Sequence, residues 1–219
     1  GGAGGGAAAP ATGGAGGLGG SILHLGCGVG GVSFQLASAF AEVLGVDNDE
    51  LLIRSARVMQ HHNELHFERL TEGMLRKTEI AHVPPGTRRD RVSFVLADVM
   101  SLGEEVTGAG PFDVVLVDAL LDRLRQPATL VKQLRELVKP GGAVVISSAN
   151  DWSSAKTPRQ AWFGGFEMSG EAMTTQAMLS HALDADFVRE SASDVPRLRR
   201  RSARRFDLDV MEVSVWRRK

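Results

Sequence analysis

The sequence contains no tyrosine, a single cysteine and almost no net charge, and each of these absences excludes a class of function. Without tyrosine, no phenol side chain can act as a catalytic base or nucleophile. The one cysteine, Cys27, excludes an internal disulfide and a zinc site built from several cysteines. A formal net charge of −1 provides no overall field that would attract nucleic acid or an anionic membrane.

Long apolar runs are also missing. No run reaches the roughly 18 residues that a membrane span requires. The first residues show neither the charged start nor the apolar centre of a secretory signal. We therefore expect a cytoplasmic protein that binds neither membranes nor nucleic acid.

Two domain-level segments follow from composition. Residues 1–20 consist mainly of glycine and alanine, which bury little surface and lose much entropy on ordering, so we expect a flexible linker. The chain begins with Gly1 rather than Met, and two interpretations stay open: a trimmed sequence, or a domain released from a longer protein. Residues 21–219 are sufficient for one domain with its own core.

Apolar segments alternate with helical patterns from residue 21 onward. Strands that are apolar throughout and separated by helices indicate a parallel sheet covered on both faces. After residue 149 the pattern changes to a Trp/Gly-rich loop at 151–170, a helix at 174–183 and two closing strands at 186–192 and 209–218. Residues 63–90 are polar and are predicted to be irregular. The other predicted strands are 22–25, 42–47, 92–98, 112–120 and 143–149, and the predicted helices are 32–40, 49–62 and 127–138.

The turn after the first strand, "LGCGVGG", is rich in glycine and indicates close approach of the backbone to a ligand. Gly26, Gly28 and Gly31 match the G-x-G-x-x-G pattern of dinucleotide-binding folds, and Asp47 follows about 20 residues later. A nicotinamide dehydrogenase is therefore one open interpretation. Gly26, Gly28 and Gly30 also match the G-x-G-x-G pattern of S-adenosylmethionine (SAM) methyltransferases.

Three later features resemble SAM methyltransferases more than dehydrogenases. Asp98 ends the third strand, where such folds contact the adenine amino group, and "VKPGG" precedes the fifth strand. The C-terminal segment suits an extra helix and an antiparallel hairpin rather than a second nucleotide-binding half. The resemblance implies an α/β, Rossmann-like class I SAM-dependent methyltransferase fold, with a mostly parallel seven-stranded sheet and an antiparallel C-terminal hairpin.

This resemblance assigns the cofactor ligands. The glycine backbone passes under the methionine part of SAM, and Asp47 accepts hydrogen bonds from both ribose hydroxyls. Asn48 contacts the adenine edge, Asp98 accepts the adenine N–H, and Val99 supplies a backbone N–H. Asp118, at the end of the fourth strand, faces the methyl group. The full expected set is Gly26, Cys27, Gly28, Gly30, Asp47, Asn48, Asp98, Val99 and Asp118.

One position departs from the methyltransferase pattern. These enzymes commonly carry an acid two residues before the first glycine, and this chain has His24. That acid anchors the ammonium end of SAM, so either Asp118 takes over its role or cofactor affinity is reduced. His24 and the missing helical region before the first strand also keep open a non-catalytic module with a SAM-binding fold.

Five stretches are similar to one family in particular, the methyltransferase domain of ovothiol biosynthesis. They are "LGCGVGGVSFQLA", "LTEGML", "LLDRLRQP", "TPRQAWFGGF" and "DVPRLRRRSARRFDLDVMEVSVW". The resemblance implies transfer of a methyl group from SAM to an imidazole ring nitrogen of 5-thiohistidine (4-mercaptohistidine). It also implies an iron-dependent sulfoxide synthase as a fused or separate partner. The open alternative is a SAM-dependent methyltransferase that acts on another small amine, thiol or acid.

The same resemblance assigns the residues that handle the substrate. Asp118 or Asp122 would serve as a base if one is needed, although orientation of the ring nitrogen can suffice. Trp152 and Trp162 would stack on the imidazole, with core packing as their alternative role. Arg204 and Arg205 would bind the substrate carboxylate, with a solvated charged face as the alternative. This chain reads "SSANDW" where the family commonly has a Ser-Pro-Tyr-Thr-Trp-like run.

The stretch "HHNELHFE" resembles an iron site because it contains His62, His66 and Glu68. On one helix, His62 and His66 would share a face and Glu68 would point about 240° away from His62. One helix cannot direct all three side chains at a metal ion. We therefore expect no metal site.

Overall fold

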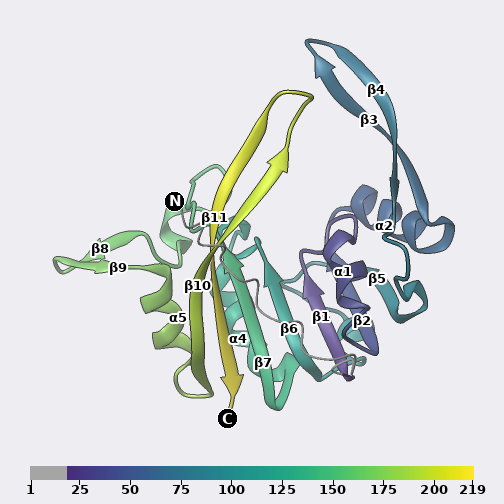
Figure 1. Ribbon diagram of the computed structural model, residues 1–219. Helices are drawn as coiled ribbons and strands as arrows, with labels where there is room; N and C mark the ends of the chain where they lie inside the picture. Colours follow the sequence, from purple (N-terminus) through teal and green to yellow (C-terminus); the bar gives the residue numbers. More distant parts are fainter. Residues whose placement is uncertain (1–18) are drawn as a thin grey trace, which may run out of the picture.

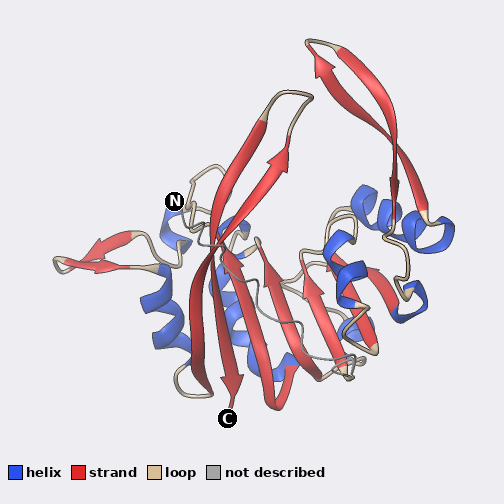
Figure 2. Ribbon diagram, in the orientation of Figure 1, coloured by secondary structure: helices blue, strands red, loops and turns tan. Residues whose placement is uncertain are grey.

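The computed structural model describes residues 19–219. The linker predicted for residues 1–20 lies almost entirely outside the described residues. A seven-stranded sheet forms the centre of the described part, in the order β10-β11-β7-β6-β1-β2-β5 (Figures 1 and 2). The strands are β1 (Ser21–Leu25), β2 (Glu42–Asp47), β5 (Val92–Leu96), β6 (Phe112–Asp118), β7 (Val138–Ser148), β10 (Phe187–Arg200) and β11 (Phe206–Arg218).

The strand directions confirm the predicted architecture. β1, β2, β5, β6 and β7 pair in parallel with their neighbours. β11 runs antiparallel to both β7 and β10, so the sheet closes with an antiparallel hairpin. All five parallel strands therefore end at the same edge of the sheet, which is the ligand-binding edge of open α/β folds.

Helices cover both faces of the sheet and create two hydrophobic layers. α1 (Gly31–Leu36) and α2 (Glu50–His62) bury Phe34 and Ile53 in one layer. α4 (Pro127–Leu137) and α5 (Thr175–Leu183) bury Leu130 and Leu179 in the other, to which the short α3 (Glu104–Thr107) adds Val106. Burial on both faces explains why the parallel strands are apolar throughout.

Local signals define the helix ends. Asp49 caps α2, because its side chain accepts hydrogen bonds from the backbone N–H groups of Leu51 and Leu52. Asn63 ends this helix with a φ of 65°. α1 is shorter than the predicted helix 32–40, since residues 37–39 form turns. None of the helices formed by residues 19–219 is long and apolar enough to cross a membrane.

The prediction of irregular structure for residues 63–90 is wrong. β3 (Glu64–Glu72) and β4 (Leu75–His82) form a separate antiparallel hairpin that projects away from the sheet (Figure 1), and η1 (Arg89–Arg91) follows it. Most of its side chains are charged or exposed, and Met74 at its turn is 94% exposed. A hairpin outside the core needs no apolar alternation, so the sequence pattern did not reveal it.

The C-terminal hairpin is longer than predicted. β11 pairs with β7 only over residues 212–217, so the distal parts of β10 and β11 pair with each other alone and extend beyond the sheet (Figure 1). Its distal part exposes Leu198, Leu208 and Val210. Within the predicted loop 151–170 the chain forms η3 (Arg159–Ala161) and β8 (Phe166–Met168), and β8 pairs with β9 (Glu171–Met173).

Candidate active site

The predicted cofactor residues meet at the carboxyl edge of the sheet. Leu25 at the end of β1 pairs with Val46 of β2 and with Val117 of β6. Asp47 at the end of β2 pairs with Leu96 of β5. This register places the glycine turn after β1 next to the acids that end β2 and β6, as the sequence predicted.

The glycine turn is held by backbone hydrogen bonds. The N–H groups of Gly26 and Cys27 both donate to Val46 O, at 2.9 and 3.0 Å. Gly26, Gly28 and Gly30 have φ values of 80°, 55° and 82°, a region that residues with a Cβ seldom adopt. The turn therefore depends on glycine for its shape.

The three glycines differ in what surrounds them. A Cβ on Gly30 would lie 2.5 Å from Phe94 Cζ, so this glycine permits close packing of α1 against β5. A Cβ on Gly28 would meet no protein atom within 4 Å. The backbone at Gly28 therefore faces open space, and this bare surface fits the methionine part of SAM.

The Asp47 carboxylate is fixed by two backbone hydrogen bonds. Its Oδ2 accepts a hydrogen bond from Gly28 N at 2.9 Å, and its Oδ1 accepts one from Asp49 N at 3.0 Å. The side chain is half-buried, so the remaining lone pairs are open to a ligand. The neighbouring Asn48 is exposed beside it. One carboxylate thus links the glycine turn to a position where two hydroxyl donors can bind.

Asp98 stands two residues beyond the end of β5. Its Oδ1 accepts a hydrogen bond from Met100 N at 2.9 Å, which leaves Oδ2 for a ligand. Asp98 is exposed, whereas the adjacent Val99 is 5% exposed and packs in the core. The Asp98 carboxylate is therefore open to the predicted contact with the adenine N–H.

Cys27 contributes to the turn through its backbone, because its thiol is not reactive. The side chain is buried, and its Sγ contacts the Gly28 carbonyl oxygen at 3.7 Å. Burial, followed by the charge of Asp47, raises the pKa of the Cys27 thiol to about 12. The thiol therefore stays protonated and acts as a small apolar group.

Asp118 ends β6 at the centre of the same edge. Its Oδ1 accepts a hydrogen bond from Ser147 Oγ at 2.9 Å, and Ser147 lies opposite it on β7. The following residue, Ala119, has a φ of 50° and donates its N–H to the Ser147 carbonyl at 2.8 Å. The Asp118 side chain is 27% exposed, so its carboxylate is accessible to a ligand. The sequence pattern carried no signal for Ser147.

His24 lies beneath this edge on β1 and is 1% exposed. Its Nδ1 is 2.8 Å from Ser33 Oγ on α1, and its Nε2 is 4.0 Å from Asp118 Oδ2. Burial lowers the pKa of His24 from 6.5 to about 4, while the charges of Asp118 and Asp47 act in the opposite direction. The imidazole is therefore neutral at physiological pH.

The other predicted acid, Asp122, lies in η2 (Leu121–Arg123) and is 2% exposed. Its Oδ2 accepts a hydrogen bond from Asp151 N at 2.9 Å, and its backbone carbonyl accepts one from Thr157 Oγ1 at 3.3 Å. These contacts fix the loop that follows β7. The structure therefore gives the buried Asp122 carboxylate a partner within the protein, and its role as a base stays a prediction.

Both predicted tryptophans use their indole N–H within the protein. Trp152 Nε1 donates to Thr175 Oγ1, and Trp162 Nε1 donates to the Thr157 carbonyl, each at 2.9 Å. Both residues are half-buried, and Trp152 packs against the core. A Cβ on Gly165 would lie 3.0 Å from Trp152 Cδ1, so this glycine permits the close approach. The Arg159 guanidinium lies over the Trp162 ring, 5.9 Å from its centroid, so stacking of either indole on a substrate stays a prediction.

Arg204 and Arg205 lie in the turn between β10 and β11, at the tip of the projecting hairpin (Figure 1). Both are exposed. The structure does not bring them to the strand ends where Asp118 lies, so the predicted contact with a substrate would require the hairpin to fold over the site.

The residues of the iron-like stretch do not share a helix. His62 ends α2, whereas His66 and Glu68 belong to β3, so the helical geometry assumed for them is wrong. Within residues 19–219, no three His, Cys, Asp or Glu side chains form a group that could hold a metal ion.

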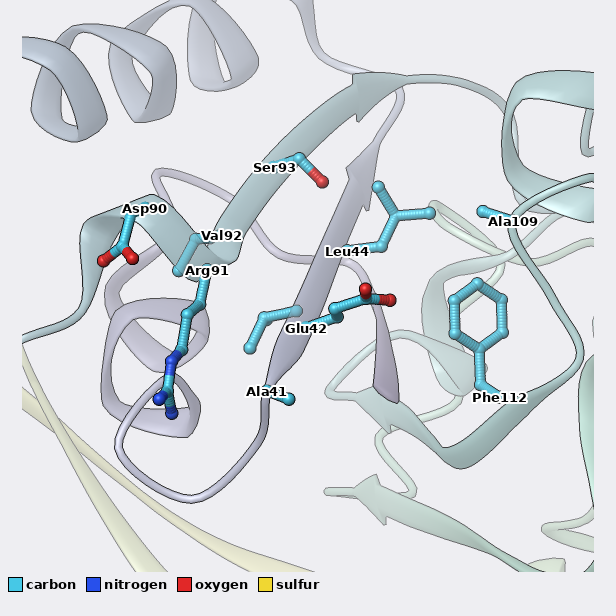
Figure 3. Close-up of a pocket in the computed structure, with 10 residues that line it drawn as sticks. Ala41, Glu42, Leu44, Asp90, Arg91, Val92, Ser93, Ala109 and Phe112 are labelled. Atoms are coloured by element: carbon cyan, nitrogen blue, oxygen red, sulfur yellow. The ribbon is translucent and has the colours of Figure 1, made fainter. Parts of the chain in front are cut away.

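A cavity of about 450 Å³ lies at the opposite edge of the sheet (Figure 3). Glu42, Val92 and Phe112 line it, and they are the first residues of β2, β5 and β6. Ligands of open α/β sheets bind at the carboxyl ends of the strands, so this cavity is not the expected cofactor site.

Comparisons with known proteins agree with this geometry. The chain is 31% identical over 137 residues to the ubiquinone biosynthesis O-methyltransferase of Acinetobacter baylyi, which covers 62% of this chain and 47% of that protein. The chain thus spans about half the length of the curated relatives that it matches.

Solved structures share the fold. N-methyltransferase NodS from Bradyrhizobium japonicum is 15% identical, with a TM-score of 0.55 over 90% of this chain and 85% of that chain. A SAM-dependent methyltransferase from Methanosarcina mazei is 18% identical, with a TM-score of 0.57 over 91% and 92% of the two chains. A family model described as a methyltransferase domain matches residues 23–144, from β1 into β7. The chain therefore belongs to the methyltransferase domain family.

Proposed function

We propose that this domain transfers a methyl group from SAM to an imidazole ring nitrogen of 5-thiohistidine. The observation that carries the methyltransferase activity is the glycine turn at residues 26–30 joined to Asp47 by the bond from Gly28 N. Family membership supports SAM as the cofactor. Among the structural neighbours, NodS has been solved with S-adenosylhomocysteine, which is the product form of SAM.

The proposal assigns each part of the cofactor to particular described residues. The open backbone at Gly28 would lie along the methionine part, and the Asp47 carboxylate would accept the ribose hydroxyls. Asn48 and Asp98 would flank the adenine position, with Val99 supplying its backbone N–H. Asp118, which ends β6 between β1 and β7, would face the methyl group.

When bound, SAM supplies an electrophilic methyl group on a sulfonium. The domain has to hold the acceptor in line with it, so that a nitrogen–carbon bond forms as the sulfur–carbon bond breaks. The acceptor also carries a thiolate, which is the better nucleophile, so the site must select the nitrogen by orientation at roughly 3 Å. Trp152 and Trp162, which are both half-buried, would stack on the flat imidazole to hold it in this way.

The choice of substrate rests on the five stretches that are similar to the ovothiol methyltransferase domain. Two of them, residues 120–127 and 157–166, contribute η2 and the segment around Trp162, next to the loop that follows β7. The same proposal includes an iron-dependent sulfoxide synthase as the source of the thiohistidine.

A second candidate function is methylation of an oxygen on another small molecule. The 31% identity to a ubiquinone biosynthesis O-methyltransferase favours it, because the match covers 62% of this chain. A substrate panel separates the two functions.

The test incubates the protein with SAM and either 5-thiohistidine, histidine or a catechol, and identifies the product by mass and by the position of the new methyl group. We expect a ring N-methyl product from 5-thiohistidine alone. A product from the catechol alone would establish the second candidate. Calorimetry with S-adenosylhomocysteine completes the test, since absence of binding would show a non-catalytic module.

A further inference from the structure

The Nε2 atom of His24 is a buried polar atom without a hydrogen-bond partner among the described residues. The ring is 1% exposed, and its other nitrogen is occupied by Ser33 Oγ at 2.8 Å. A buried donor or acceptor without a partner lowers the free energy of unfolding by about 1–3 kcal/mol. Such an atom next to the proposed cofactor site is therefore a candidate for a functional role.

Electrostatics selects one tautomer of this ring. Nε2 is 4.0 Å from the carboxylate oxygen Oδ2 of Asp118, and Asp47 adds a second negative charge nearby. A lone pair directed at an anion is repelled, whereas an N–H directed at it is attracted. His24 therefore carries its proton on Nε2 and accepts a hydrogen bond from the Ser33 hydroxyl at Nδ1.

Two buried donors are consequently aimed at Asp118 from the protein side. Ser147 Oγ already donates to Oδ1 at 2.9 Å, and Ser147 is 7% exposed. The His24 N–H faces Oδ2 at 4.0 Å, which is about 1 Å longer than an ordinary hydrogen bond. At this distance the contact between the His24 ring and the carboxylate is electrostatic and is not a hydrogen bond.

We propose that His24 is a positioning residue, which holds the Asp118 carboxylate so that its exposed lone pairs receive the ammonium group of the methionine part of SAM. This inference rests on the proposed function, because it concerns the same cofactor. His24 itself is too deeply buried to touch the ligand. In this arrangement Asp118 provides the negative charge that the position of His24 commonly supplies in methyltransferases.

The first test reads the tautomer without any ligand. Long-range nitrogen–proton NMR of the ¹⁵N-labelled protein distinguishes a protonated Nε2 from a protonated Nδ1. We expect the Nε2–H form at pH 7, and we expect S-adenosylhomocysteine to shift this nitrogen further than its deamino analogue does. A protonated Nδ1 would overturn the proposal.

The second test compares affinities for S-adenosylhomocysteine and for the analogue that lacks the amino group. In His24→Phe, which keeps an aromatic ring but removes the donor, the Kd for S-adenosylhomocysteine should rise about 10-fold. The Kd for the deamino analogue should change less than about twofold. His24→Gln retains an N–H donor, so its Kd for S-adenosylhomocysteine should lie close to the wild-type value. Equal losses for both ligands in His24→Phe would overturn the proposal.

A control variant separates positioning from general loosening of the strand. Ile22→Val removes one buried methyl group on β1, where Ile22 is 2% exposed, and it should leave the ratio of the two Kd values unchanged. If the wild-type protein binds neither ligand, the proposed function fails, and the tautomer measurement still decides the geometry of His24. If the wild type binds both ligands with equal affinity, the function stands and the proposal is overturned.

Discussion

The carboxyl edge of the sheet has two parts that are held in different ways. We call the glycine turn and Asp47 the cofactor side, and the loop after β7 the acceptor side, because the proposed function assigns them to SAM and to the methyl acceptor. On the cofactor side, the turn at residues 26–30 and Asp47 are fixed by backbone N–H groups that lie close in the register of β1 and β2. On the acceptor side, the loop after β7 is fixed by side chains from distant segments, such as the bonds from Trp152 to Thr175 and from Asp151 N to Asp122. A site made by backbone geometry requires particular residues at short, fixed spacings, whereas a site made by side-chain contacts does not.

Because backbone geometry holds the glycine turn, we expect substitutions in this turn to have the largest effects on stability and cofactor affinity. Gly30→Ala combines a φ of 82° with a Cβ 2.5 Å from Phe94, so it should lower the free energy of unfolding by about 3 kcal/mol. Gly28→Ala meets no protein atom and should cost only about 1 kcal/mol of stability, yet it should abolish measurable cofactor binding. Denaturant unfolding and calorimetry give the two quantities.

Gly73→Ala is the matched control for Gly28→Ala, because Gly73 has a φ of 54° and open space around its Cβ position in the β3–β4 turn. It should cost a similar free energy and leave cofactor affinity unchanged. Equal affinity losses at Gly28 and Gly73 would show that backbone strain, rather than the ligand surface, is responsible.

The next prediction concerns the pH dependence of stability that His24 produces. The pKa of His24 is about 4 in the folded protein and 6.5 without burial, so the unfolded chain binds more protons between these values. Stability should therefore fall by roughly 3 kcal/mol as the pH drops from 6.5 to 4. His24→Phe should abolish this fall in stability between pH 6.5 and 4. If the fall persists in His24→Phe, other titratable groups cause it.

A smaller effect is expected for the ribose contact. Asp47→Asn keeps the shape of the side chain but replaces one acceptor oxygen with an NH₂ group. Since Gly28 N and Asp49 N each donate to one carboxylate oxygen, the NH₂ group would face one of these donors and that hydrogen bond would be lost. The Kd for S-adenosylhomocysteine should rise about 30-fold. Asp122→Asn on the acceptor side is the comparison, and it should change this Kd less than about twofold. A similar rise in this Kd in both variants would show that the cofactor does not depend on Asp47 more than on Asp122.

The smallest effect is expected at the hairpin tip. In the described arrangement Arg204 and Arg205 lie beyond the strand pairs that join β11 to β7. Replacing both with alanine should leave the KM for the acceptor within about twofold and stability within about 0.5 kcal/mol. A tenfold rise in KM would show that the hairpin folds over the acceptor and that these arginines bind it.

The same contrast explains which parts of the molecule the sequence predicted. The parallel sheet, the glycine turn and the strand-end acids Asp47 and Asp118 were predicted, because each depends on local periodicity or fixed spacing. The β3–β4 hairpin was missed because its side chains are mostly exposed, and only Leu65 and Ala81 at its base pack against the core. Ser147 and Ser33 were missed because serine in a strand or helix carries no pattern until a fold places it beside Asp118 or His24.

The acceptor side shows the same limit in a second way. Asp122 was expected as a possible base from its charge and position in the sequence, and the fold instead buries it against the backbone of Asp151. Charge and sequence position alone do not tell whether a carboxylate faces a ligand or the protein. Only the register of β6 and β7, which sets where the following loop runs, separates Asp118 from Asp122.

The most direct test of the central claim is calorimetric titration of the wild-type protein with S-adenosylhomocysteine, accompanied by backbone amide NMR. We expect saturable binding of one ligand per chain, with the largest shifts at the amides of residues 26–30 and around Asp47. Absence of binding heat and of shifts in that turn, or saturable binding of NAD at the turn in place of S-adenosylhomocysteine, would contradict the assignment.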